Sequence, residues 1–146
     1  MILYLDSSSL VKLYVEETHS EQVRRWVDEA TVVSTSVVAY PEAAAAFARK
    51  AREGGIEPES LAPIVAALEG DWSEYAVIGV SERPAGGLAV KHGLRGFDAI
   101  HLAAALELAT ETTGAPIAFS SFDARLNRAA VSEGLAVLEP LAVQKI

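Results

Sequence analysis

Short apolar runs alternate along the chain with longer segments in which apolar residues recur every three or four positions. The short runs predict buried strands, and the longer segments predict amphipathic helices. The expected strands are residues 2–5, 31–34, 76–80, 117–120 and 135–138. The expected helices are residues 7–15, 19–30, 41–52, 57–72, 81–92, 98–110 and 123–133. Because strands alternate with helices, the pattern favours the α/β class, with a parallel sheet covered on both faces.

The length and composition indicate one globular domain over residues 1–146. A chain of 146 residues can bury one core but is too short for two ordinary domains, and it shows no repeat or linker. Hydrophobic residues make up 51% and charged residues 22%, which excludes a disordered or fibrous protein. The formal net charge of −8 excludes nucleic-acid binding through bulk positive charge, although it permits a local basic groove.

The residue types that are missing narrow the chemistry further. The chain has no cysteine, which excludes disulfides, thiolate zinc sites and cysteine nucleophiles. The apolar start stops at Asp6 with no basic residue before it, so it does not match a secretory signal. No apolar run reaches the roughly 18 residues that a membrane-spanning helix needs. We therefore expect a cytoplasmic protein without a membrane segment.

Aspartate is rare in this chain, and its positions are informative. Fifteen of the twenty acidic residues are glutamates, which favour helices and solubilise surfaces, so most of them need no further explanation. By contrast, Asp6 directly follows the first expected strand, Asp123 follows the fourth, and Asp98 opens the most strongly patterned helix. Functional groups in open α/β sheets gather beyond the carboxyl ends of strands, where the strand order reverses. If the first and fourth strands are central neighbours, Asp6 and Asp123 flank that crevice.

These acids also have a purely structural interpretation. Aspartate is a preferred helix N-cap, and Asp6, Asp98 and Asp123 each precede a helical pattern. Glu42, in the first turn after Pro41, could simply complement the helix dipole. The joint occurrence of the four acids, each within a distinctive local sequence, favours a functional role instead.

Four local sequences resemble the acidic motifs of PIN-domain proteins, in particular the VapC-type toxins of type II toxin–antitoxin systems. They are LDSSSLVKLY at 5–14, YPEAA at 40–44, LRGFDAIHLAAA at 94–105 and SSFDARL at 120–126. Their order and spacing are similar to those of the family over essentially the whole chain. The resemblance implies a three-layer, PIN-like sandwich whose five-stranded parallel sheet has the order 3-2-1-4-5. It also implies a metal-dependent ribonuclease, a cognate VapB-type antitoxin and a homodimer.

Asp6, Glu42, Asp98 and Asp123 are the expected catalytic residues and metal ligands. Two like charges about 4 Å apart cost about 4 kcal/mol at an effective dielectric constant of about 20, so converging carboxylates need a cation or protons. Their oxygen atoms suit a hard ion, Mg²⁺ or Mn²⁺. Such an ion can activate a water for attack on the phosphorus of an RNA phosphodiester. It also reverses the local charge, which lets an acidic site bind an anionic backbone.

Five further residues are expected to support this site. Ser8 and Ser121 would orient carboxylates or contact phosphate, although local turn hydrogen bonds explain them equally well. Asn127 stands where some members of the family have another carboxylate, which leaves open whether the site holds one or two ions. Arg125 and Arg128 lie in the first turns after the fourth acid and are expected to contact phosphate.

Two other features have mainly structural interpretations. His101 lies three residues past Asp98 on an apolar helix, and we expect a packed structural residue there rather than a ligand. Residues 43–72 are apolar and rich in alanine across two helices, which suggests an interface with a partner.

Two alternatives to a ribonuclease remain open. One is a catalytically weak PIN-like module that only binds a partner, but such a module should have lost an acid, and all four are present. The other is a phosphoacceptor receiver domain, which shares the doubly wound architecture. A receiver needs an aspartate after the third strand, where this chain has Gly79, Val80 and Ser81.

Overall fold

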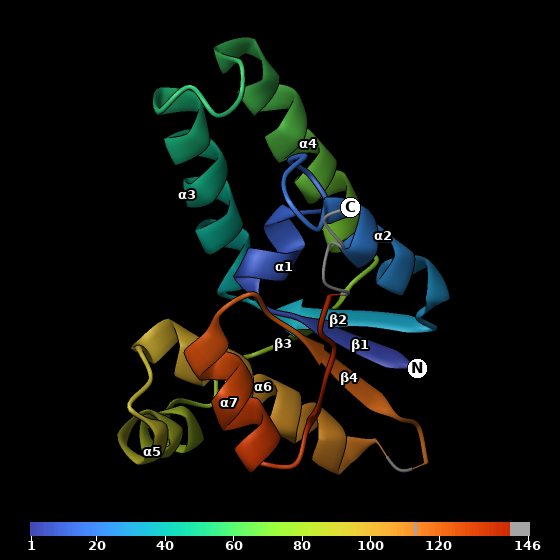
Figure 1. Cartoon of the computed structure of the whole chain (residues 1–146), viewed down its shortest axis with the longest axis vertical. Helices are drawn as coiled ribbons and strands as arrows, with labels where there is room; N and C mark the ends of the chain where they lie inside the picture. Colours follow the sequence, from blue (N-terminus) through green and yellow to red (C-terminus); the bar gives the residue numbers. More distant parts are fainter. Residues whose placement is uncertain (113, 141–146) are drawn as a thin grey trace, which may run out of the picture.

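Five parallel strands form one sheet, in the order β3-β2-β1-β4-β5, in the computed structural model, which describes residues 1–112 and 114–140 (Figure 1). The strands are β1 (Ile2–Leu5), β2 (Val32–Ser36), β3 (Ala76–Ile78), β4 (Ile117–Ser120) and β5 (Ala136–Val137). The helices are α1 (Ser7–Val11), α2 (Ser20–Glu29), α3 (Ala39–Arg52), α4 (Leu61–Trp72), α5 (Glu82–His92), α6 (Gly96–Glu111) and α7 (Ala124–Ser132), with a 3₁₀ turn, η1 (Pro58–Ser60), before α4. Within these described residues, none of the helices has the length and apolarity to cross a bilayer.

The central position of β1, between β2 and β4, determines where a site can form. Ile2 lies opposite Val32 on one side and Ile117 on the other. The chain adds β2 and β3 on one side of β1 and then returns to add β4 and β5 on the other, so the order reverses between β1 and β4. This order confirms the expected 3-2-1-4-5. It excludes the receiver alternative, whose strand order is 2-1-3-4-5.

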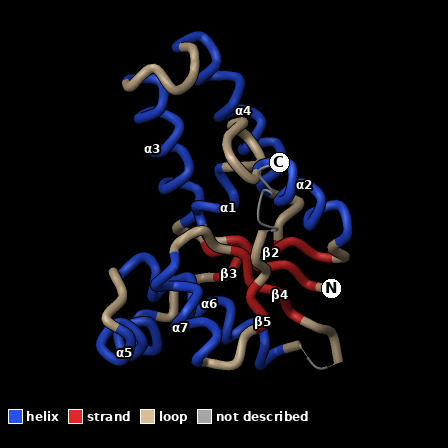
Figure 2. The backbone as a smooth tube through the Cα atoms, viewed as in Figure 1, coloured by secondary structure: helices blue, strands red, loops and turns tan. Residues whose placement is uncertain are grey.

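Two hydrophobic cores, one on each face of the sheet, make the fold a three-layer sandwich. Successive side chains of a strand point to opposite faces. Accordingly, Leu3 and Leu5 belong to the core that contains α1–α4, whereas Ile2 and Tyr4 belong to the core that contains α5–α7. Figures 1 and 2 show these two groups of helices on opposite sides of the sheet. A strand buried on both faces explains the uninterrupted apolar run at the start of the chain.

Several element boundaries differ from the expected ones by a few residues. Helix α3 begins at Ala39, not at Pro41, so Pro41 is the third residue of the helix. Its missing N–H costs nothing there, because the first N–H groups of a helix have no intrahelical partner. Helix α1 ends at Val11 instead of continuing to residue 15. His19 does not start α2 but precedes it with a left-handed φ of 71°, which is uncommon for a residue other than glycine.

Helices α3 and α4 project from the sheet as a hairpin (Figure 1). Helix α3 begins beside the sheet and ends far from it, so Glu42 in its first turn lies near the sheet while Arg52 lies at the distant end. Gly54, two residues after the end of α3, has a φ of 80°, a conformation that glycine adopts without a steric penalty. The start of the hairpin therefore places Glu42 at the edge of the sheet, while the rest of the hairpin extends away from the sheet.

The connection between α5 and α6 places another acid. Gly93 ends α5 with a left-handed φ of 64°, Leu94 is buried, and Arg95 is the N-cap residue of α6. Asp98, which was expected to open this helix, is therefore its third residue, and no side chain caps the helix. The N-cap interpretation is therefore wrong for Asp98. Its carboxylate does not cap the free backbone N–H groups at the start of α6.

Candidate active site

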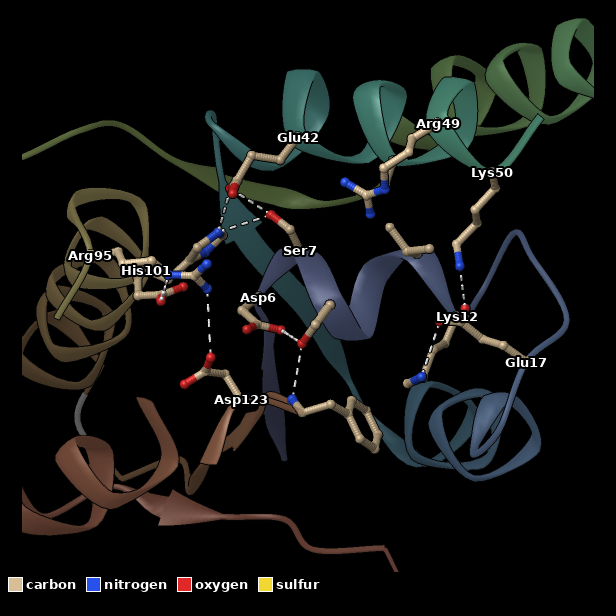
Figure 3. Close-up of a pocket in the computed structure, with 15 residues that line it drawn as sticks. Asp6, Ser7, Lys12, Glu17, Glu42, Arg49, Lys50, Arg95, His101 and Asp123 are labelled. Atoms are coloured by element: carbon tan, nitrogen blue, oxygen red, sulfur yellow. Dashed lines mark hydrogen bonds and ion pairs between the residues drawn. The ribbon is translucent and has the colours of Figure 1, made fainter. Parts of the chain in front are cut away.

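The four acids come together around one cavity at the carboxyl ends of β1 and β4 (Figure 3). Asp6 follows β1, Glu42 belongs to α3, Asp98 to α6, and Asp123 precedes α7, yet all four line a cavity of about 430 Å³. This is the crevice at which the strand order reverses. The placement agrees with the expectation that residues remote along the chain meet at this point.

Asp6 is both a helix cap and a cavity residue. Its Oδ1 accepts hydrogen bonds from the Ser9 backbone N–H (3.0 Å) and from the Ser8 hydroxyl (2.7 Å), and the side chain is almost entirely buried. Burial raises the pKa of Asp6 above its usual value, and the nearby His101 and the hydrogen bonds from Ser121, Ser8 and Ser9 offset this only in part. Ionising Asp6 in the folded protein therefore costs free energy. A cation bound beside the carboxylate would offset that cost.

Asp6→Asn should raise the free energy of unfolding by about 1 kcal/mol at neutral pH in EDTA, because it removes a buried charge and keeps the cap. Burial raises the folded-state pKa of Asp6 above 3.8, so the ionised carboxylate destabilises the native state above that folded pKa, and the penalty disappears as the pH falls toward 3.8. Denaturant unfolding should therefore show a gain that shrinks on acidification. A gain of the same size at pH 4 and pH 7 would contradict the burial argument.

Ser8 and Ser121 tie the two loops at this edge together. The Ser8 hydroxyl accepts the Phe122 N–H at 2.9 Å, and the Ser121 hydroxyl accepts the Asp123 N–H at 3.0 Å. Asp123 in turn caps α7, because its Oδ1 accepts the Leu126 N–H at 2.8 Å. Both serines therefore orient the segments that carry carboxylates, and Ser8 orients Asp6 directly.

Arg95 lies between two of the acids. Its Nε donates to Oδ2 of Asp98 at 3.1 Å, and its Nη2 is 3.6 Å from Oδ2 of Asp123 (Figure 3). The arginine side chain is 78% exposed, whereas that of Asp98 is 15% exposed. An exposed ion pair is worth at most about 1 kcal/mol, so Arg95 is a replaceable partner for these carboxylates.

Glu42 is held by a chain of hydrogen bonds that ends in the core. Its Oε1 accepts from the Ser7 hydroxyl at 2.6 Å and from Nε2 of His101 at 2.9 Å, and Nδ1 of His101 meets the Tyr4 hydroxyl at 2.8 Å. Because a carboxylate only accepts, Nε2 carries the hydrogen of the bond to Glu42. Burial alone would raise the pKa of Glu42, but the hydrogen bonds from His101 and Ser7 lower it below its usual value. The network keeps Glu42 ionised and oriented.

The other end of the cavity is basic. It is lined by Lys12, Arg49 and Lys50. The Nζ atoms of Lys12 and Lys50 lie 3.0 and 2.8 Å from the two carboxylate oxygens of Glu17. Figure 3 shows Arg49 extending from α3 toward the cavity. Burial alone would raise the pKa of Glu17, but the hydrogen bonds from Lys50 and Lys12 lower it below its usual value. Because one carboxylate faces two ammonium groups, this end of the cavity keeps a net positive charge, although the net charge of the chain is −8.

Four of the five expected support residues lie outside the lining of this cavity, and Ser121 among them still bonds a segment that carries one of the acids. The other three make different contacts. Arg125 donates to the Gly93 carbonyl at 3.2 Å, and Arg128 lines a separate hollow on α7. Asn127 lines that second hollow as well, where its Nδ2 donates to the Ser121 carbonyl at 2.8 Å. The structure therefore does not bring these three residues to the acids, and the basic charge near the acids comes from other positions.

Sequence reasoning missed Ser7, Arg95 and His101. Arg95 and His101 each lie three residues from Asp98, on either side of it, so their spacing was a signal that they could share its site. His101 is buried, as expected, but it is hydrogen-bonded to Glu42 and lines the cavity, so the purely structural interpretation is incomplete. Its contact with Tyr4 joins α6 to β1, and no local pattern could predict that contact.

The donors suit a hard cation in their chemistry. Four carboxylates supply oxygen atoms only, which Mg²⁺ and Mn²⁺ prefer. Among residues 1–112 and 114–140, no three histidine, aspartate or glutamate side chains already stand in an arrangement that could hold an ion. Arg95 and His101 hold three of the four acids in their present positions.

Comparison with known proteins places this architecture in a family. Residues 3–132 match the sequence profile of the PIN domain. Ribonuclease VapC45 of Mycobacterium tuberculosis (strain CDC 1551 / Oshkosh) is 35% identical over 144 residues, which cover 93% of this chain and 94% of the relative. Ribonuclease VapC3 of Pyrobaculum aerophilum is 32% identical over 110 residues, which cover 72% of this chain and 82% of the relative.

Solved structures share the fold. A toxin–antitoxin complex from Klebsiella pneumoniae contains a chain with a TM-score of 0.65 and 13% identity, and the match covers 97% of this chain and 99% of that one. VapC20 of Mycobacterium tuberculosis, described as a sarcin-ricin loop cleaving toxin, gives a TM-score of 0.63 and 18% identity and covers 94% and 99% of the two chains. At such identities the likeness concerns the fold alone. The match over residues 3–132 and the 35% identity to VapC45 show that the chain belongs to the PIN domain family.

Proposed function

We propose that this protein is an endoribonuclease dependent on Mg²⁺ or Mn²⁺ and that it acts as the toxin of a VapBC-type toxin–antitoxin pair. The observation that carries the proposal is the meeting of Asp6, Glu42, Asp98 and Asp123 around one cavity at the switch point of the sheet. Membership of the PIN domain family and 35% identity to a protein named as a ribonuclease support it.

The four acids would hold the cation, and the surrounding residues would orient them. When bound, the cation supplies an activated water and stabilises the charge that develops on the phosphate. Ser8 directs one carboxylate oxygen of Asp6, while Ser7 and His101 direct Glu42. Asp98 and Asp123 are less buried than Asp6, and both face the exposed Arg95.

The basic end of the cavity would bind the RNA backbone. Lys12, Arg49 and Lys50 place positive charge beside the acids, in the same cavity. Phosphates flanking the cleaved bond can therefore lie on cations while the scissile phosphate lies over the acids. This polarity explains how a chain with a net charge of −8 can bind an anionic polymer.

The proposal extends to the partner and the organisation of the chain. Solved structures that share the fold include a toxin–antitoxin complex, which supports a cognate VapB-type antitoxin as the protein partner. The whole chain, 1–146, would form the single catalytic domain. A homodimer and a cytoplasmic location stay predictions.

The purified protein, freed of any antitoxin, should cleave RNA when Mg²⁺ or Mn²⁺ is supplied, and EDTA should abolish cleavage. Mn²⁺ should also raise the melting temperature of the wild type but not that of Asp6→Asn, because a ligand that binds the native state stabilises it. No cleavage of total RNA with either ion would contradict the proposed activity. Equal Mn²⁺ shifts in the two proteins would remove Asp6 from the ligand set.

A further inference from the structure

Arg95 has an unusual place among the cations of this chain. It is the N-cap residue of α6, and its guanidinium meets Oδ2 of Asp98 at 3.1 Å and Oδ2 of Asp123 at 3.6 Å. The cavity that these acids line also contains Arg95 itself (Figure 3). Lys12 and Lys50 pair with Glu17 at the other end, whereas Arg95 pairs with two of the proposed ligands.

A guanidinium on Oδ2 of Asp98 and Asp123 competes with a metal ion for the same negative charge. Arg95 neutralises part of the repulsion between Asp98 and Asp123, which a divalent cation would do more completely because it carries twice the charge. A guanidinium stays protonated at any pH that the protein meets, so it can leave these oxygens only by moving. With 78% of its side chain exposed, Arg95 has room to swing into solvent or onto a phosphate.

We propose that Arg95 is an internal counter-ion for Asp98 and Asp123 that a divalent cation displaces, so that Arg95 sets the cation affinity of the site. This inference rests on the proposed function, because it takes these acids as cation ligands. It adds that Arg95 partly neutralises the metal-free site and that cation binding and release of the guanidinium are one event.

Direct titration with Mn²⁺ in the absence of RNA tests the inference. The free ion can be followed by its electron paramagnetic resonance signal, with the full-length wild type and its variants. Arg95→Gln should bind Mn²⁺ about tenfold more tightly, because the competing charge is gone. Arg95→Lys keeps a cation but loses the two-pronged geometry, so its affinity should lie between the other two. Arg52→Gln removes the same charge at the far end of α3 and should match the wild type.

The outcomes separate this inference from the proposed function. If wild type binds Mn²⁺ and Arg95→Gln binds it equally or more weakly, Arg95 is not a competitor and the inference fails while the metal site stands. If neither protein binds Mn²⁺, the proposed metal site fails and takes the inference with it. Arg52→Gln binding as tightly as Arg95→Gln would reduce the effect to overall charge. Melting curves in EDTA check folding, and Arg95→Gln should melt slightly lower because two carboxylates lose their counter-ion.

Discussion

Asp98→Asn should lower the rate of Mn²⁺-dependent RNA cleavage by at least about a hundredfold while leaving the fold unchanged. Asparagine has nearly the same shape, but it cannot contribute the negative charge that holds a hard cation. Asp98 does not cap α6, and the ion pair it forms is with the exposed Arg95, so the free energy of unfolding should change by less than about 1 kcal/mol. Single-turnover cleavage at saturating RNA and denaturant unfolding measure the two quantities.

Asp28→Asn is the matched control. Asp28 is an exposed aspartate on α2, outside the lining of the cavity, so the same chemical change there should leave cleavage within about twofold of wild type. A wild-type rate in Asp98→Asn, or an equal loss in Asp28→Asn, would show that the cavity acids do not carry the reaction.

His101→Leu should cost about 2 kcal/mol of stability and reduce cleavage by about tenfold to a hundredfold. Leucine has a similar volume but offers no hydrogen bond. The Tyr4 hydroxyl, which is fully buried, then loses its partner, and Glu42 loses the donor that orients it. Denaturant unfolding and cleavage kinetics of the same preparation measure the two losses.

The double variant Tyr4→Phe/His101→Leu separates packing from positioning. Removing both buried hydrogen-bonding groups should restore most of the stability, because no polar group is left unsatisfied. Activity should stay low, since Glu42 still lacks its donor. If restored stability brought back full activity, His101 would be a packing residue only, as its apolar helix suggested.

Much of the fold could be predicted because short-range patterns dominate it. The run Ile2–Leu5 had to be a strand covered on both faces, and alternation with amphipathic segments required parallel pairing. The exact helix starts could not be predicted in the same way. Pro41 is equally acceptable at the first or third helical position, so tertiary packing of Ala39 decided where α3 begins.

The site was predictable to the extent that its residues follow strands. Asp6 and Asp123 lie where any α/β sheet gathers function, and their cap roles do not compete with it, because a cap uses one oxygen of Asp123 while the other faces Arg95. The partners of the acids were harder to predict. Glu42 and His101 are 59 positions apart, and which cation faces which acid depends on side-chain directions that only the assembled fold defines.

The pairing of β1 with β4 also sets when activity can arise during protein synthesis. Ile2 pairs with Ile117, so the middle of the sheet closes only after nearly all of the polypeptide has been made. Until Asp123 has emerged from the ribosome, the proposed cation site lacks one of its four carboxylates. The four acids can therefore meet only late in synthesis or after the chain has been released.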